Sequence, residues 1–218
     1  DIQGTFTPGT GTVLYKGTNT GTTTVDAQTY YALEIDSGQK HVLEGFTNAS
    51  STLSITQGTL DTNGKKLHAT STLTLAGTLN AHASAITAGR HWSSTGTFNP
   101  GSSTVTFTAT SSTNNITSNT SPFYALTLND GGGAATYQLQ DLLNASSTLT
   151  ITGGTLDANG KTMNLDGNFA NSDVFTHSSN TVKFTSTSGT TTVTSSGSAF
   201  NTLIFNDSGG TGIYAPAD

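Results

Sequence analysis

Hydrophobic residues recur along the chain in pairs separated by a single residue, with polar residues around each pair. This alternation, as in "STLSI" and "STLTI", is typical of a β-strand with one buried face. The pairs return at a constant interval in the first part of the chain and at slightly longer intervals within the later parts. They are Val13/Tyr15, Leu33/Ile35, Leu53/Ile55, Leu73/Leu75, Val105/Phe107, Leu126/Leu128, Leu149/Ile151, Val182/Phe184 and Leu203/Phe205. The pattern predicts an all-β fold, a single-stranded parallel β-helix (β-solenoid) of about ten coils with about 20–23 residues per coil.

A β-solenoid specifies which side chains stack on one another. Each inward side chain lies over its equivalent in the next coil, about 4.8 Å away, and its burial contributes about 1.5–3 kcal/mol. One ladder is expected to contain Val13, Leu33, Leu53 and Leu73, and a second ladder Tyr15, Ile35, Ile55 and Leu75. The threonines between them face solvent, and Gly, Asn and Asp form the corners.

Longer repeats contain these coils. "NASSTLSITQGTLDTNGK" (48–65) and "NASSTLTITGGTLDANGK" (144–161) agree at 15 of 18 positions. Similar segments at 4–15, 96–107 and 173–184 open three copies, which cover approximately 4–91, 96–172 and, truncated, 173–218. The first copy is about one coil longer, an insertion that a solenoid tolerates because each coil contacts only its neighbours. We therefore expect residues 1–218 to form one continuous β-solenoid.

Composition narrows the classes of function. Only 9% of the residues are charged, the formal net charge is −6, and the seven Lys and Arg residues are scattered, so nucleic acid is not an expected partner. The absence of Cys excludes disulfides and Cys-based metal sites. There is no apolar run long enough to cross a bilayer, and we expect no membrane span. Low charge with abundant Thr, Ser, Asn and Gly is typical of exported bacterial surface proteins, and this predicts an extracellular location.

Two acidic motifs raise the question of calcium binding. "LDTNGK" and "LDANGK" place Asp61 and Asp157 at the start of a D-x-N-G pattern, as in some calcium loops. The twelfth position, which is Glu in an EF-hand, is Thr72 or Asn168 here. We interpret both motifs as turns in which Asn-Gly adopts left-handed φ and Asp bonds the local backbone.

Glu34 and Asp36 are the best candidates for the carboxylate pair that a glycan-cleaving enzyme requires. The equivalent residues are Thr127 and Asn129 in the second copy, and Ile204 and Asn206 in the third. A structural corner is the favoured interpretation, and no catalytic residue is assigned.

The histidines supply the most unusual local chemistry. They are His41, His68, His82, His91 and His177. His82 and His91 lie in or next to the extra coil of the first copy, beside Arg90 and Trp92. A zinc site would need a third ligand that the pattern does not supply, and no metal or cofactor is assigned. Trp92 aligns with Phe169 and is expected to be a core or corner aromatic rather than a platform for a sugar.

Outward side chains form two further patterns. Thr104, Thr106 and Thr108, and likewise Thr148, Thr150 and Thr152, alternate with buried residues and are similar to the Thr rows of ice-binding solenoids. The coil at Leu33 departs from this pattern, with Ala32 and Glu34. N-x-[ST] triplets occur at Asn48, Asn115, Asn119 and Asn144, and they matter only in a eukaryotic secretory host.

The repeated string G-x-F-x-P-G-x-x-x-V, then F-Y-x-L-x-I, then L-x-I-x-x-G-x-L-D-x-N-G-K resembles repeats of very large bacterial surface proteins. It is similar to the β-helical passenger regions of adhesins and autotransporter-like proteins, and the resemblance covers nearly all of the chain. It implies a stalk or spacer on the cell surface, with no catalytic residues. Residues 67–92 depart from the pattern and are where a specialised role would most easily lie.

Both ends of the sequence fall within a repeat, since Asp218 aligns with Asp141, and neither carries the pattern of a capping helix. An uncapped solenoid end is an open strand edge that invites pairing. The expected partners are other copies stacked end to end, or flanking repeats of a longer chain, with surface glycans as a further class. The leading prediction is a non-enzymatic extracellular structural protein, a stalk or adhesin segment or a fibre subunit. The alternatives are a glycan-binding or glycan-cleaving β-helix and an ice-binding solenoid.

Overall fold

The computed structural model describes residues 6–17 and 21–218, and over these residues the protein is an all-β parallel β-solenoid of about ten turns with no helix. The predicted fold class is confirmed. The chain divides into two compact units, Asp1–Thr104 and Val105–Asp218, which are described separately. That residues 1–218 form one continuous solenoid stays a prediction. Among the described residues, no helix is long and apolar enough to cross a membrane.

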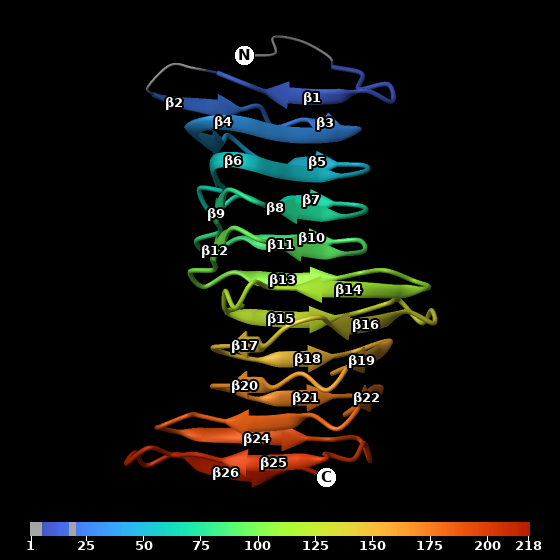
Figure 1. Cartoon of the computed structure of the whole chain (residues 1–218), viewed down its shortest axis with the longest axis vertical. Helices are drawn as coiled ribbons and strands as arrows, with labels where there is room; N and C mark the ends of the chain where they lie inside the picture. Colours follow the sequence, from blue (N-terminus) through green and yellow to red (C-terminus); the bar gives the residue numbers. More distant parts are fainter. Residues whose placement is uncertain (1–5, 18–20) are drawn as a thin grey trace. The chain divides into compact units, whose positions relative to one another are not determined.

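The first unit consists of short parallel strands that succeed one another coil by coil (Figure 1). Its strands are β1 (Thr12–Tyr15), β2 (Thr22–Val25), β3 (Thr29–Tyr30), β4 (Ala32–Leu43), β5 (Thr47–Ala49), β6 (Leu53–Asp61), β7 (Leu67–Ala69), β8 (Leu73–Leu75), β9 (Thr78–Asn80), β10 (Ala85–Ala88), β11 (Trp92–Ser94) and β12 (Thr97–Asn99). One face is formed by β1, β4, β6, β8 and β11, and another by β3, β5, β7 and β10. The second part of β6 pairs with β9, and β9 with β12, to form a third face.

The side-chain ladders of the first unit follow the predicted register. Val13 pairs with Leu33, Leu33 with Leu53 and Leu53 with Leu73. The second ladder likewise runs Tyr15, Ile35, Ile55 and Leu75. From β4 onward these side chains are at most 1% exposed. Trp92 continues the first ladder over Leu73 and is fully buried, as expected of a core aromatic.

The second unit uses three parallel sheets. Its strands are β13 (Thr104–Phe107), β14 (Thr113–Thr117), β15 (Ala125–Leu128), β16 (Thr136–Leu139), β17 (Leu143–Ala145), β18 (Leu149–Ile151), β19 (Thr155–Asp157), β20 (Met163–Leu165), β21 (Phe169–Asn171), β22 (Val174–Thr176), β23 (Thr181–Phe184), β24 (Thr190–Thr194), β25 (Thr202–Phe205) and β26 (Ile213–Pro216). One sheet contains β14, β16, β19 and β22, a second contains β17, β20, β23 and β25, and a third runs from β13 through β15, β18, β21 and β24 to β26.

The third sequence copy does not continue the ladder of the second. Leu126/Leu128 in β15 stack on Leu149/Ile151 in β18. Val182/Phe184 in β23 instead stack on Met163/Leu165 in β20, in the sheet that begins with β17. The coils of this unit before β17 have two strands each, whereas the coils of β17–β19 and β20–β22 have three. Because of the added strand, residues that are equivalent in the repeat alignment lie in different sheets.

One corner of the coil is a tight turn that several different sequences form. In five turns, the backbone N–H of the fourth residue donates to the carbonyl of the first, at 2.7–3.0 Å. The donor and acceptor residues are Lys65 and Thr62, Ser84 and Ala81, Ser103 and Pro100, Lys161 and Ala158, and Asn180 and His177. In the Asn-Gly turns, φ is 51° at Asn63 and 73° at Gly64, and it is 48° and 69° at Asn159 and Gly160. "LDTNGK" and "LDANGK" are therefore corners, as predicted.

A neighbouring corner of the first unit is lined by glycines at equal intervals along the sequence: Gly58, Gly77 and Gly96. A Cβ on Gly77 would lie 2.6 Å from the carbonyl oxygen of Gly58, and one on Gly96 would lie 2.1 Å from that of Gly77. Both distances are below van der Waals contact, so successive coils approach too closely here for any side chain. Glycine at this position lets the backbones pack at the coil spacing.

We expect Gly77→Ala to lower the free energy of unfolding by about 1–3 kcal/mol, because the new methyl group forces two coils apart. Urea titration followed by circular dichroism measures this change. Gly38→Ala is the matched control, since a Cβ at Gly38 meets no atom within 4 Å. It should change stability by no more than about 0.5 kcal/mol. Equal effects of the two substitutions would show that the glycine corner is not a packing constraint.

Candidate functional site

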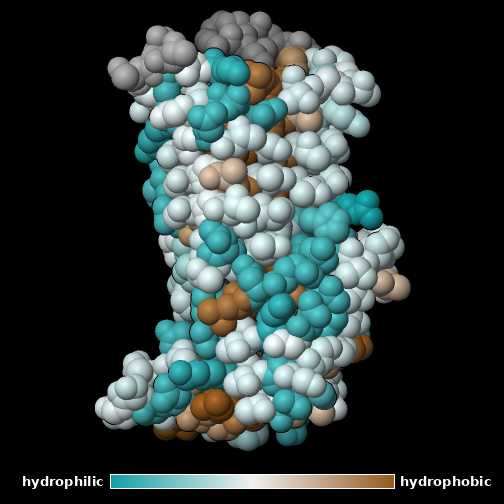
Figure 2. Space-filling view, viewed as in Figure 1, coloured by the Kyte–Doolittle hydropathy of each residue, from teal (hydrophilic) through white to brown (hydrophobic). Residues whose placement is uncertain are grey.

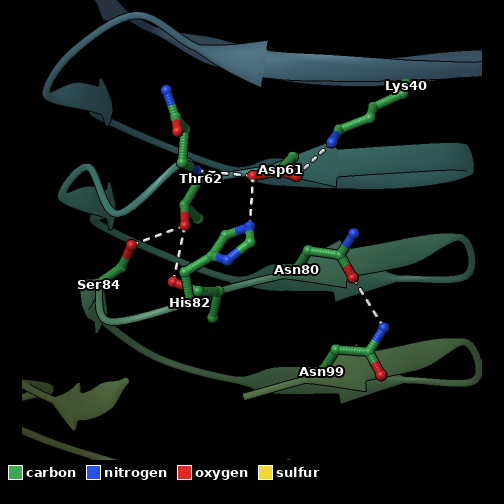
Figure 3. Close-up of polar contacts among 9 residues, drawn as sticks. Lys40, Asp61, Thr62, Asn80, His82, Ser84 and Asn99 are labelled. Carbon is green, nitrogen blue, oxygen red and sulfur yellow. Dashed lines mark hydrogen bonds and ion pairs between the residues drawn. The ribbon is translucent and has the colours of Figure 1, made fainter. Parts of the chain in front are cut away.

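A cluster of polar side chains in the first unit surrounds the carboxylate of Asp61, at the end of β6 (Figure 3). Lys40 of β4 lies with its Nζ 2.7 Å from Oδ2 of Asp61, and His82 lies with its Nε2 2.8 Å from Oδ1. The backbone N–H of Asn63 also donates to Oδ1, at 2.8 Å. The Asp61 side chain is only 6% exposed, whereas those of Lys40 and His82 are 48% and 54% exposed. A buried carboxylate is thus held between two cations or donors that face solvent.

The environment of Asp61 favours its charged form. Burial on its own raises the pKa of the carboxyl, but the hydrogen bonds from Lys40, Asn63 and His82 outweigh it, so that the pKa lies below its ordinary value. Asp61 is therefore ionised at neutral pH. A carboxylate in this state is a poor general acid.

The hydroxyl groups near His82 are already committed to other acceptors (Figure 3). Ser84 Oγ donates to Thr62 Oγ1 at 2.6 Å, and Thr62 Oγ1 donates to the Ala81 carbonyl at 2.8 Å. These two hydrogen bonds link the turns of two neighbouring coils. The Asp61–His82 pair therefore links two neighbouring coils. Ser84 does not form a hydrogen bond with the imidazole, as a catalytic serine nucleophile would.

The contact among Lys40, Asp61 and His82 was not predicted from the sequence. Lys40, Asp61 and His82 follow one another at an equal interval along the sequence, close to the length of one coil, and this spacing is the signal that could have joined them. Asp61 was considered for calcium and His82 for zinc, each without the other. Within residues 6–17 and 21–218, no group of three or more His, Cys, Asp or Glu side chains is placed to hold a metal ion.

Other aspartates also act as acceptors for turn backbones. Asp141 accepts from the backbone N–H of Ser118 at 2.9 Å and from that of Asn119 at 2.6 Å. Asp218 accepts in the same way from the backbone of Ser195, at 3.0 Å, and of Ser196. The predicted equivalence of Asp141 and Asp218 is therefore matched by equivalent contacts. Both carboxylates bind the turn one coil earlier in the chain.

Glu34 and Asp36 do not form an isolated carboxylate pair. Asp36 lies 3.2 Å from Nζ of Lys16 and accepts a hydrogen bond from Gln57 Nε2 at 2.9 Å. The hydrogen bond from Lys16 is the main reason that the pKa of Asp36 lies below its ordinary value. Glu34 lies beside Ser54 in the β4–β6 register. Both residues lie within β4 and not in a turn between strands, with Asp36 at an irregularity in the pairing of β4 with β6, so the expected corner is wrong for this pair.

The five histidines do not gather at one site. His41 is buried, with Nδ1 bonded to the Thr23 hydroxyl and Nε2 to the Ser37 hydroxyl, and burial lowers its pKa. His68 lies in register with Asn48, and burial lowers its pKa as well. His91, Arg90 and His177 belong to loops and turns outside the strands.

Trp92 and Phe169 are both core aromatics with similar ring contacts, although β11 and β21 belong to different sheets. The ring of Trp92 meets Phe98 edge-on at a centroid distance of 5.0 Å. Phe169 meets Phe175 in the same way at 5.6 Å. Neither Trp92 nor Phe169 is exposed, so neither ring is available as a stacking surface for a sugar.

The outward threonines do not form an unbroken row on the sheet that contains β15, β18 and β21. Thr127 pairs with Thr150, but Thr150 pairs with Ala170. The hydroxyl of Thr152 donates to the Leu128 carbonyl, at 3.0 Å. Of the N-x-[ST] asparagines, Asn115 and Asn119 are exposed, and Asn48 and Asn144 are partly buried.

Each unit has a shallow hollow on the surface of its described residues. A hollow of about 300 Å³ beside β17, β20 and β23 is lined by Asn144, Ser146, Asn164 and Asp166, among other residues. A larger one, of about 620 Å³, lies between β1 and β2 and includes Tyr15 and His41 in its lining. The smaller hollow has one carboxylate in its lining and the larger has none, whereas glycoside hydrolysis uses two.

Known proteins do not assign a role to any of these groups. A scan of the chain against protein-family models found no match, and searches of curated proteins and of solved structures found none either. The role of each candidate residue therefore follows from its own contacts. For Asp61, Asp141 and Asp218, these contacts hold one coil against the next.

The lowered pKa of Asp61 predicts a pH dependence of stability. The carboxyl of the unfolded chain has an ordinary pKa of 3.8, and the folded value is lower. The stabilisation is therefore fully present above the unfolded value and is lost as the pH falls through the folded one. Asp61→Asn should remove the part of the acid-induced loss of stability that comes from this carboxylate. It should also lower the free energy of unfolding at pH 7 by roughly 1–3 kcal/mol.

Urea titrations between pH 7 and pH 2 measure both effects. Asp166→Asn changes an exposed carboxylate and is the matched control, with an expected change of no more than about 0.5 kcal/mol at pH 7. An unaltered acid transition in Asp61→Asn would contradict the role of this cluster.

Proposed function

We propose that the protein is a non-enzymatic structural segment of an extracellular surface protein or fibre, which self-associates through the end strands of its solenoid. The observation that carries this proposal is the exposure of core positions in the last coil of the second unit. Leu203 and Phe205 are 37% and 48% exposed, whereas Val182 and Phe184, on which they stack, are fully buried. A further coil on this side, from a second copy or from flanking repeats of a longer chain, would complete the ladder.

Exposed hydrophobic side chains gather on the last two strands, β25 and β26. Ile204 and Ile213 are also exposed, at 41% and 60%. In Figure 2, hydrophobic atoms lie along the lower edge of the view, at the level where Figure 1 labels β25 and β26. Contiguous exposed hydrophobic side chains on a strand edge favour association with another chain.

The polar groups support a structural role. The carboxylates of Asp141 and Asp218 bind turn backbones in equivalent ways in successive repeats. Asp61 is braced by Lys40 and His82. Residues that recur with the same backbone contacts maintain coil geometry. This favours a stalk or spacer, as in adhesin-like surface proteins, over a glycan-cleaving enzyme.

Electron microscopy of the purified protein tests the proposal. We expect linear assemblies that lengthen with protein concentration, because each added copy presents a new end strand. Phe205→Glu places a charge in the exposed edge and should reduce the assemblies to single chains while leaving the circular dichroism spectrum unchanged. Single chains of the unaltered protein at every concentration would contradict self-association.

A further inference from the structure

The hollow of about 300 Å³ beside β17, β20 and β23 lies within the second unit. Residues 146–148 connect β17 to β18 and residues 166–168 connect β20 to β21, whereas the longer segment 185–189 connects β23 to β24. Pro122 lines the hollow from the coil before β17, and Thr185 and Thr187 line it from the longer connection. The recess therefore lies where two short corners are followed by a longer one.

Asp166 is exposed and lines this hollow, and its carboxylate accepts no hydrogen bond from any residue that the structure describes. The other aspartates of the second unit all accept hydrogen bonds: Asp130, Asp141, Asp157, Asp173, Asp207 and Asp218. Thr70 stands at the equivalent position of the first copy, where its N–H donates to Ala49 at 2.9 Å, as the N–H of Asp166 does to Ala145. The coil thus forms with or without this carboxylate, and a structural contact does not account for Asp166.

Two asparagine side chains that line the hollow are held in a fixed orientation. Asn144 Nδ2 donates to the Thr120 carbonyl at 3.1 Å, and Asn164 Nδ2 donates to Asn144 Oδ1 at 2.9 Å. Each amide nitrogen retains a second hydrogen, and Asn164 Oδ1 accepts no hydrogen bond from the described residues. The hollow therefore presents N–H donors and oxygen acceptors whose directions are set before a ligand arrives, which lowers the cost of binding.

Tyr124 supplies an aromatic surface next to these polar groups. It is 37% exposed, and the backbone N–H of Ser147 donates to its carbonyl at 2.8 Å. The residue before it, Phe123, is bridged to Ala145. Tyr124 therefore lies one coil before Ser146, which lines the hollow. A tyrosine ring offers an apolar face for packing and a hydroxyl group for hydrogen bonding.

We propose that this hollow binds a neutral oligosaccharide, with one or two sugar units in contact with Asp166, Asn164 and Tyr124. Sugar hydroxyls donate to the carboxylate and to Asn164 Oδ1, and they accept from the amide N–H groups. The C–H face of a sugar ring packs against the Tyr124 ring. A volume of about 300 Å³ is at the small end of ligand sites, which limits the contact to a short stretch of glycan. The site does not depend on the proposed self-association, since none of its lining residues belongs to β25 or β26.

Other classes of ligand fit the hollow less well. β20 is paired with β17 on one side and with β23 on the other, so it offers no strand edge to an extended peptide. Lys183 is the register partner of Asn164 in the next coil, and it offsets the single charge of Asp166, which disfavours a charged polymer. The hydroxyl and amide groups that make up most of the lining match a ligand with a hydroxyl on most of its carbon atoms.

Saturation-transfer difference NMR tests this binding, with maltose, cellobiose and lactose as the probes. The hollow is shallow and leaves much of a ligand in solvent, so we expect dissociation constants in the millimolar range. The method detects binding in that range and tolerates large assemblies of the protein. At least one of the three disaccharides should receive saturation from the protein, and its signal should level off as the disaccharide concentration rises.

Two variants and two matched controls locate the contact. Asp166→Asn removes the carboxylate and Tyr124→Ala removes the stacking surface, and each should weaken the signal at least about fivefold. Glu44→Gln changes an exposed carboxylate of the first unit, and Tyr31→Ala changes a tyrosine that is 37% exposed, as Tyr124 is. Both controls should keep the signal of the unaltered protein.

The absence of a signal from all three disaccharides would overturn the proposal, as would a signal that Asp166→Asn and Tyr124→Ala leave unchanged. Circular dichroism of each variant checks that the coils remain folded, and Asp166→Asn carries the test by itself if Tyr124→Ala does not fold. Electron microscopy reports on self-association separately, so the failure of one proposal leaves the other standing.

Discussion

The backbone hydrogen bonds between successive coils are the constraint on which the rest of the structure depends. They fix the spacing at which each side chain meets its equivalent one coil later. Most strands are very short, so each contributes few bonds, and the register must be maintained by the corners. The five tight turns and the Gly58–Gly77–Gly96 corner do this in different ways. The turns change the direction of the chain through one local hydrogen bond, and the glycines let two backbones approach within a distance that excludes any side chain.

The same constraint explains the contacts of Asp141 and Asp218 with turn backbones. A turn leaves backbone N–H groups without partners in the ladder, and a carboxylate one coil away can accept from two of them at once. Asp141 and Asp218 do so. These donors favour the charged form and lower the pKa of Asp218. A carboxyl group that acts as a general acid needs a raised pKa, whereas the contacts of Asp218 lower its pKa.

The sequence predicted the features that depend on period alone. The ladders from Val13 to Leu73 and from Tyr15 to Leu75 follow from the constant interval between hydrophobic pairs. The corner at "LDTNGK" follows from the turn preference of Asn-Gly. The period did not predict the cluster of Lys40, Asp61 and His82. The cluster depends on how far three side chains of different length reach across a corner. Nor did the period predict that Val182/Phe184 would change sheet, since an alignment shows equivalent residues but not the number of strands in each coil.

The exposure of Leu203 and Phe205 in β25 follows from the way a solenoid buries its core. Each coil covers one side of its neighbour, so a further coil, from a second copy or from a flanking repeat, would bury the exposed side chains of β25. A contact between two single coils involves few residues and lies at the small end of protein interfaces. Its affinity is therefore modest, because much of the gain from burial offsets the lost freedom of the two chains. Such a contact becomes effective where copies are held close together, since a high local concentration replaces intrinsic affinity. A dense array on a surface supplies that condition, and this links the exposed edge to the proposed structural role.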